Sequence, residues 1–179
     1  MKKKSIREVI VGTATRLFYR QGYSNTGINQ IVDEAGIAKS SLYHYFKSKE
    51  DLLMAYLEET GAKTHAALKA AADEVNEPRD KVVAIFDYLE GLVQQKDFFG
   101  CNFLNIVYEL PEDAVRIREQ VKYQKDTVRQ LFAEILQPIH KERLADEIYT
   151  LFEGALIGNK VHSDTWPIVR ARDIVKKLI

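Results

Sequence analysis

The 179-residue sequence is poor in cysteine and proline, with one cysteine, Cys101, and four prolines, and its formal net charge is zero. A single cysteine excludes an intramolecular disulfide and is typical of a reducing compartment, so we expect a cytoplasmic protein. No apolar run approaches the roughly 20 residues of a membrane span, so no membrane partner is expected. With 46% hydrophobic and 29% charged residues, the composition is typical of a soluble globular protein.

Patterns that mark sheets and enzymes are also missing. No stretch alternates apolar and polar residues between hairpin turns, so strands are not expected. The sequence contains no HExxH or similar metal-ligand spacing, no nucleophile motif and no phosphate-binding glycine loop. One polar group could still meet in space: His140, Asp146, Glu147 and His162. A solvated charged surface is the better interpretation of that group, so we expect no enzyme, no metal site and no cofactor.

Helical periodicity runs through the chain and predicts an all-α protein of about nine helices. The expected helices span about 5–21, 28–35, 39–45, 48–70, 78–96, 101–109, 112–136 and 141–162, with a last helix that has Pro167 in its first turn. All four prolines fall near helix edges, where a missing N–H costs little. Gly22 and Gly36 are expected to end the first two helices, and Thr26 and Ser48 to cap the second and fourth.

The helix expected at 39–45 separates into two faces when each residue is turned by 100°. The polar arc comprises Lys39, Ser40, Tyr43 and His44, and the opposite, packing arc comprises Leu42, Tyr45 and Phe46. Two short helices joined by a glycine turn, the second with an exposed polar face, are typical of a helix-turn-helix. Such a helix fits the major groove of DNA, although a merely solvated face is the alternative.

Charge and the start of the fourth helix support an anionic partner. Residues 1–57 carry nine Lys and Arg against five Asp and Glu, whereas residues 58–179 carry seventeen against twenty-one. Lys49 lies in the first turn of the fourth helix, where its ammonium and free backbone N–H groups could together hold a phosphate. Lys2, Lys3 and Lys4 are either a DNA-binding arm or a solvated tail.

The stretch "ATRLFYRQGYSNTGINQIVDEAGIAKSSLYHYFKSKEDLL" carries many landmarks at fixed spacing, among them Gly22-Tyr23 and Tyr45-Phe46. Residues 5–57, under a third of the chain, resemble the N-terminal domain of the TetR family of bacterial transcriptional regulators. The resemblance implies a ligand-released repressor that acts as a homodimer on a palindromic double-stranded DNA operator. It divides the chain into a DNA-binding domain (1–47), a connecting helix (48–70) and a helical effector-binding and dimerisation domain (71–179). The alternative is a helical scaffold, or partner-binding protein, that has lost DNA binding.

The resemblance also implies which residues contact DNA. Thr26 matches a phosphate-contacting threonine, and Lys49 matches the lysine that binds phosphate from the fourth helix. The recognition helix would meet bases and backbone through Lys39, Ser40, Ser41, Tyr43, His44 and Tyr45. Ala38 departs from the family, which often has serine there, and the missing cap costs about 1 kcal/mol.

The helical body is expected to hold the pocket of an unknown small-molecule effector and the dimer interface. The pocket candidates share an apolar or aromatic character, and for each of them ordinary core packing is the alternative: Phe86, Phe103, Val107 and Tyr123. The dimer candidates lie on the last two helices, where two glycines four residues apart permit close approach: Gly154, Ala155, Gly158, Ile168 and Ile174. By position, these helices resemble the four-helix dimer interface of the family.

Cys101 offers a further alternative function. A Gly-Cys pair with a following asparagine resembles some branches of the family, in which cysteine responds to electrophiles or oxidants. A reactive thiol needs exposure and a lowered pKa, and Lys96 is the nearest basic residue along the sequence. A free cysteine is more often a buried small apolar residue, so a cysteine-based redox-sensing regulator stays an alternative hypothesis.

Overall fold

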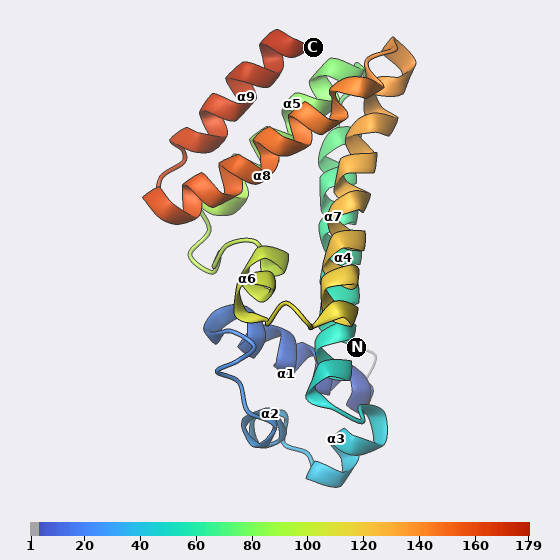
Figure 1. Ribbon diagram of the computed structural model, residues 1–179, viewed down its shortest axis with the longest axis vertical. Helices are drawn as coiled ribbons and strands as arrows, with labels where there is room; N and C mark the ends of the chain where they lie inside the picture. The colour runs from blue at the N-terminus through green and yellow to red at the C-terminus, as the bar shows by residue number, and fades with distance from the viewer. Residues whose placement is uncertain (1–3) are drawn as a thin grey trace. The chain divides into compact units, whose positions relative to one another are not determined.

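The computed structural model describes residues 4–179, and in that range the chain forms nine α-helices and no strand (Figure 1). The predicted all-α class is therefore confirmed. The helices are α1 (Ile6–Gln21), α2 (Ile28–Ala35), α3 (Lys39–Tyr45), α4 (Lys49–Asp73), α5 (Pro78–Val93), α6 (Asn102–Glu109), α7 (Val115–Leu136), α8 (Ala145–His162) and α9 (Trp166–Leu178). No helix in residues 4–179 combines the length and the apolar character that crossing a membrane requires.

Two helices begin later than the sequence predicted. The helix expected at 112 begins at Val115, because the residues after Pro111 form a turn first. The helix expected at 141 begins at Ala145, after the 3-10 turns Gln137–Ile139 and Glu142–Leu144. Pro78 and Pro167 lie in the first turns of α5 and α9, as predicted.

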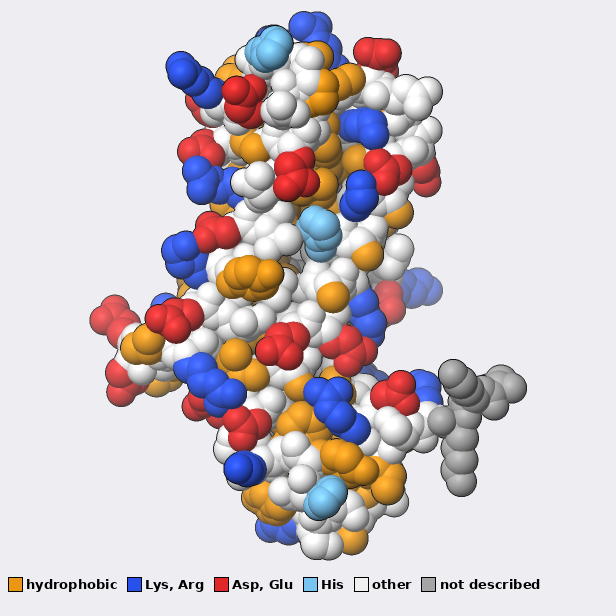
Figure 2. All heavy atoms as spheres, turned by 90° about the vertical axis from the view of Figure 1, so that its right-hand side faces the viewer, with side chains coloured by type: hydrophobic (Ala, Val, Ile, Leu, Met, Phe, Trp, Pro, Cys, Tyr) orange, Lys and Arg blue, Asp and Glu red, His pale blue; other side chains and the backbone are white. Residues whose placement is uncertain are grey.

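The helices pack into two compact units. Unit 1 comprises the chain up to Gly61 together with Asn102–Val121, and unit 2 comprises Ala62–Cys101 together with Lys122–Ile179. The sequence predicted that 102–121 belong to the C-terminal body, whereas α6 and the start of α7 pack in unit 1 with the N-terminal helices. The face drawn in Figure 2 shows basic and acidic side chains interleaved, with hydrophobic side chains between them.

Unit 1 is built on α1. Ser5 and Glu8 form a capping box at its start, in which the Glu8 carboxylate accepts from the Ser5 N–H at 2.6 Å. Its buried stripe includes Ile10, Ala14 and Phe18, and α2 and α3 pack against this helix. Because α2 and α3 have only eight and seven residues, they depend on this packing for stability.

The predicted helix ends in unit 1 are confirmed, but one predicted cap is wrong. Gly22 and Gly36 end α1 and α2 with positive φ angles of 92° and 64°. Ser48 accepts from the Asp51 N–H at 3.0 Å and so caps α4. Thr26 does not cap α2, because its hydroxyl donates to the carbonyl of Gly22 at 2.7 Å, at the end of α1.

Unit 2 has a large apolar core formed by α5, α7, α8 and α9 with the second half of α4. Three aromatic rings meet in it: the centroids of Phe86, Phe132 and Phe152 lie 5.8 to 6.4 Å apart. Two of these rings cross near a right angle, which suits the charge distribution of aromatic faces and edges.

Candidate functional site

Helix α3 is held in place by two apolar side chains, one within the helix and one directly after it. Leu42 is fully buried and Phe46, the residue after the helix, is 5% exposed. Ala38 precedes the helix and provides no side-chain hydrogen bond to it, as expected for alanine. The helix is thus fixed by packing on α1 and α2 rather than by a cap.

The opposite side of α3 carries an exposed polar and aromatic surface, as predicted. Lys39, Ser40, Tyr43 and His44 are exposed, and Ser41 is partly exposed. We call these five residues, together with Tyr45, the α3 face.

Tyr45 was predicted to pack with Leu42 and Phe46, and that placement is wrong, because Tyr45 is 42% exposed. The helix ends at Tyr45 and the backbone of Phe46 is extended, so the helical wheel does not hold at this end. The Tyr45 ring instead meets the His44 ring edge-on at 5.1 Å. Its exposure places it with the residues that were predicted to contact DNA.

Lys49 lies at the start of α4 and is bound within unit 1. Its ammonium donates to the carbonyl of Tyr23 at 2.6 Å and lies 4.1 Å from the centroid of the Tyr23 ring. Burial lowers the pKa of Lys49, and the charge of Glu109 opposes that shift. Because an ammonium has three donors, the bond to Tyr23 leaves donors for a phosphate.

Thr26 has a structural role in this conformation. Its side chain is 1% exposed, donates to Gly22 and accepts from the amide of Gln21 at 3.2 Å. The hydroxyl is therefore not on the surface, which contradicts a direct phosphate contact through it. The sequence could not show this, because the resemblance fixes the residue but not the direction of its side chain.

Two other side chains of unit 1 were missed by sequence reasoning. The guanidinium of Arg7 lies 5.4 Å over the ring of Phe46, beside the end of α3. Glu109, at the end of α6, accepts from the N–H of Ser24, a residue 85 positions away, at 2.7 Å. No local pattern signals either contact.

Of the predicted basic arm, Lys2 and Lys3 lie outside the described residues, and Lys4 is exposed.

The four predicted effector contacts are divided between the two units. Phe86 lies in the aromatic core of unit 2, and Phe103 is buried in unit 1, as part of the helix that also carries the partly exposed Val107. Tyr123 is 65% exposed and lines a hollow of about 880 Å³ on unit 2. That these four residues line one pocket stays a prediction, because periodicity shows which residues are apolar but not which helices meet.

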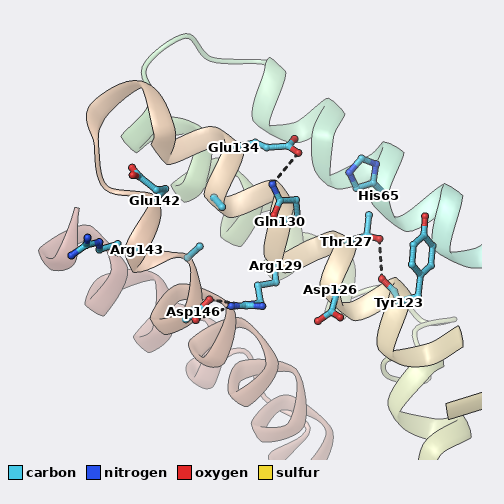
Figure 3. A pocket seen from close by; sticks show the side chains of 12 residues that line it. His65, Tyr123, Asp126, Thr127, Arg129, Gln130, Glu134, Glu142, Arg143 and Asp146 are labelled. Carbon is cyan, nitrogen blue, oxygen red and sulfur yellow. Dashed lines mark hydrogen bonds and ion pairs between the residues drawn. The ribbon is translucent and has the colours of Figure 1, made fainter. Parts of the chain in front are cut away.

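The hollow beside Tyr123 has a mostly polar and charged lining (Figure 3). His65 of α4 lies on one side of it, and Arg129 of α7 donates to both carboxylate oxygens of Asp146 at 2.6 and 2.9 Å on the other. The remaining lining residues are Asp126, Thr127, Gln130, Ala133, Glu134, Glu142, Arg143 and Ala145. The ion pair with Arg129 lowers the pKa of Asp146, chiefly through the hydrogen bonds.

Cys101 belongs to a polar group inside unit 2. The ammonium of Lys125 lies 3.1 Å from its sulfur and donates to both oxygens of Glu153 at 2.8 and 2.7 Å. The side chains of Lys125 and Glu153 are only 13% and 16% exposed. Burial opposes the charge on Lys125, but Cys101 and Glu153 outweigh it and raise its pKa. Burial, followed by the charge of Glu153, raises the pKa of Tyr149.

The predicted dimer residues fall on two different surfaces. Ala155 and Ile168 are 3% and 0% exposed within the chain's own core. A Cβ at Gly158 would lie 2.8 Å from Cβ of Pro167, so this glycine serves the packing of α8 on α9. Ala155 and Ile168 therefore pack within unit 2, whereas Gly158 is partly exposed. The role of these three residues in an intermolecular contact stays a prediction.

Gly154 and Ile174 are exposed, as an interface requires. Further large apolar residues are exposed on the same two helices: Ile157, Val161, Trp166 and Leu178. We call these six residues the α8–α9 face.

Comparison with known proteins places this geometry in a family. A family model for bacterial regulatory proteins of the tetR family matches residues 10–56, which include α2, α3 and the start of α4. The chain is 43% identical over 77 residues to the uncharacterized HTH-type transcriptional regulator YxaF of Bacillus subtilis (strain 168), an alignment that covers 42% of this chain and 40% of that protein.

Two further likenesses extend over nearly the whole chain. The HTH-type transcriptional repressor DhaR of Mycobacterium sp. (strain GP1) is 25% identical over 178 residues, which cover 94% of this chain and 89% of the relative. The crystal structure of SCO4454, a TetR-family transcriptional regulator from Streptomyces coelicolor, is similar with a TM-score of 0.88 and 26% identity, covering 97% of this chain and 87% of that one. The chain belongs to the TetR family of bacterial transcriptional regulators.

Proposed function

We propose that the protein is a cytoplasmic repressor that binds a palindromic operator as a homodimer and leaves it when a small-molecule effector binds. The observation that carries this proposal is the α3 face, which is exposed while Leu42 and Phe46 fix the helix from behind. The name of the relative DhaR supports repression rather than activation.

The α3 face supplies the chemistry that reading a duplex requires. Lys39 can donate to guanine acceptors in the major groove, and Ser40 can serve as donor or acceptor. The hydroxyls of Tyr43 and Tyr45 can reach phosphate oxygens, and their rings can contact a thymine methyl group. Lys49 adds a phosphate contact through the donors that Tyr23 leaves free.

The α8–α9 face is the proposed dimer contact. It is an apolar surface on two adjacent helices, and burying it against a second copy removes that area from water. A two-fold dimer would present two α3 helices to half-sites about one helical turn, roughly 34 Å, apart. The palindrome and the dimer therefore follow from one symmetry.

The effector is proposed to bind in unit 2, and the hollow beside Tyr123 favours a polar compound. Its lining combines an aromatic ring and an imidazole with several ionised groups, which are partners for charged or hydrogen-bonding ligands. Release requires that the effector bind the non-DNA-binding state more tightly. A shift from mostly bound to mostly free needs about 5 kcal/mol of such differential affinity.

The test is to select bound duplexes from a random DNA library and then measure affinity against salt concentration. We expect a palindrome, and each phosphate contact should add about 0.9 to the slope of log K against log salt. Tyr43→Ala should weaken binding about tenfold or more, because it removes a contact from the centre of the α3 face. Tyr108→Ala, which removes a tyrosine that is 74% exposed on α6, is the matched control. Recovery of no enriched sequence, with or without candidate effectors, would favour the scaffold alternative.

A cysteine-based response is the second candidate, and the position of Lys125 favours it. A neighbouring ammonium stabilises a thiolate, the reactive form of cysteine, and Lys125 lies 3.1 Å from the sulfur. If the thiol is the sensor, peroxide or iodoacetamide should release the operator from the wild-type protein but not from Cys101→Ser. Because Cys101 is the only cysteine, the mass of the labelled protein reports its modification directly. An equal response of both proteins would contradict this function.

A further inference from the structure

A carboxylate from α6 is built into the turn that joins α1 to α2. Glu109 is the last residue of α6, and its Oε2 accepts from the backbone N–H of Ser24 at 2.7 Å. The bond joins two segments of unit 1 that lie 85 residues apart in the chain. Because α6 is not part of the helix-turn-helix, this hydrogen bond links the motif to a helix outside it.

The turn is shaped to receive this carboxylate. A Cβ at Gly22 would lie 2.7 Å from Oε1 of Glu109 and 3.0 Å from Oε2, so a side chain there would occupy the space of the carboxylate. The backbone of Gly22, with φ 92° and ψ 156°, also lies in a region that is nearly exclusive to glycine. Both the conformation and the missing side chain of Gly22 therefore favour the contact with Glu109.

The same turn holds Lys49. The residue between Gly22 and Ser24 is Tyr23, whose carbonyl accepts from the Lys49 ammonium at 2.6 Å and whose ring lies under it at 4.1 Å. The carboxylate of Glu109 also attracts this ammonium through space. A shift of the turn would move both groups that hold Lys49, so Glu109 is placed to fix where the ammonium points.

We propose that Glu109 is a positioning residue for DNA binding: it fixes the turn at Gly22–Ser24 and thereby holds Lys49 where it can contact a phosphate. This inference rests on the proposed function, in which Lys49 contacts the operator. It adds a regulatory consequence, because a movement of α6 that withdraws Glu109 would loosen Lys49 without disturbing the α3 face. The operator would then lose a phosphate contact while its bases are still read.

A double-mutant cycle tests whether Glu109 acts through Lys49. Operator affinity is measured for the wild-type protein, Glu109→Ala, Lys49→Met and the double variant. Residues that act as a unit show an interaction energy of 0.5 kcal/mol or more, which is at least about a twofold effect. We expect Glu109→Ala to weaken binding at least about twofold in the wild-type background and not at all in the Lys49→Met background.

The salt dependence provides a readout that a purely structural role would not change. Loss of one phosphate contact lowers the slope of log K against log salt by about 0.9. We expect this change in Lys49→Met and, in part, in Glu109→Ala. The matched control is Glu112→Ala, which removes an exposed glutamate from the same region and should leave the slope unchanged.

The possible results separate this inference from the proposed function. An equal loss of affinity from Glu109→Ala in both backgrounds, no loss, or a gain would overturn the positioning role while leaving the regulator intact. Full operator binding by Lys49→Met would overturn the phosphate contact itself, and the positioning role with it. If Glu109→Ala does not fold, Glu109→Met takes its place in the cycle, because methionine keeps the length of the side chain but offers no oxygen to the Ser24 N–H.

Discussion

The α3 face of unit 1 and the Cys101 group of unit 2 are both polar clusters, but they are assembled differently. The six residues of the α3 face all come from one helix of seven residues. The Cys101 group joins residues from a loop, α7 and α8, with Lys125 and Glu153 lying 24 and 52 positions after the cysteine. A surface on a single helix can be predicted from periodicity, whereas a cluster formed by tertiary packing cannot.

The two units also differ in what stabilises them. Unit 2 buries three aromatic rings and a large aliphatic core. Unit 1 contains two helices of eight and seven residues that are ended by glycine or extended backbone and carry few buried side chains. We therefore expect core substitutions in unit 2 to change the free energy of unfolding most. Substitutions at turns and helix caps should have smaller effects, and these are expected in unit 1.

The largest effect is expected at Phe86. Phe86→Ala removes a fully buried ring that contacts Phe132 and Phe152, and should lower the free energy of unfolding by about 3 to 5 kcal/mol. Chemical denaturation followed by circular dichroism measures this change. Phe86→Leu, which keeps much of the volume, is the control and should lose less. A loss below about 1 kcal/mol for Phe86→Ala would contradict the assignment of stability to the unit 2 core.

A smaller loss is expected at the turn of unit 1. Gly22→Ala places a side chain on a backbone that favours glycine, and should lower the free energy of unfolding by about 1 to 3 kcal/mol. Gly12→Ala is the matched control, because Gly12 lies inside α1 with open space around its Cα and alanine favours helix there. Thermal unfolding of the two variants should therefore shift in opposite directions. An unchanged or higher melting temperature of Gly22→Ala would show that the turn is not strained.

The smallest effect is a gain at the start of α3. Ala38→Ser introduces the missing cap and should raise the free energy of unfolding by about 0.5 to 1 kcal/mol, seen as a higher melting temperature. Ala35→Ser is the control, since residue 35 ends α2 and serine there caps nothing. A fall in the melting temperature of Ala38→Ser would mean that packing on Leu42 and Phe46 already fixes the start of the helix.

The fold could be predicted from the sequence largely because helix periodicity, glycine stops and proline positions are local signals. The errors arose where a side chain had two possible environments. Thr26 was expected to cap the start of α2, but its hydroxyl donates a hydrogen bond to the carbonyl of Gly22 at the end of α1. Tyr45 was expected to be buried, but it is exposed at the last position of its helix. Small and apolar residues on α8 and α9 could equally pack within the chain or between copies.

The recognition surface was predictable for a different reason from the rest of the site. The α3 residues are fixed both by periodicity and by the family resemblance, and the matched family model covers them. The contacts of Lys125 and Glu109 have no local signal, because each depends on where a distant helix lies. Such contacts can be identified only after the helices are placed in space.

The single tryptophan of the chain gives the α8–α9 face its own optical signal. Trp166 is 49% exposed at the start of α9, and its ring lies 5.1 Å from that of His162. Indole emission moves to shorter wavelength when water is excluded. Fluorescence recorded during dilution would therefore follow the proposed association of two subunits without any attached dye.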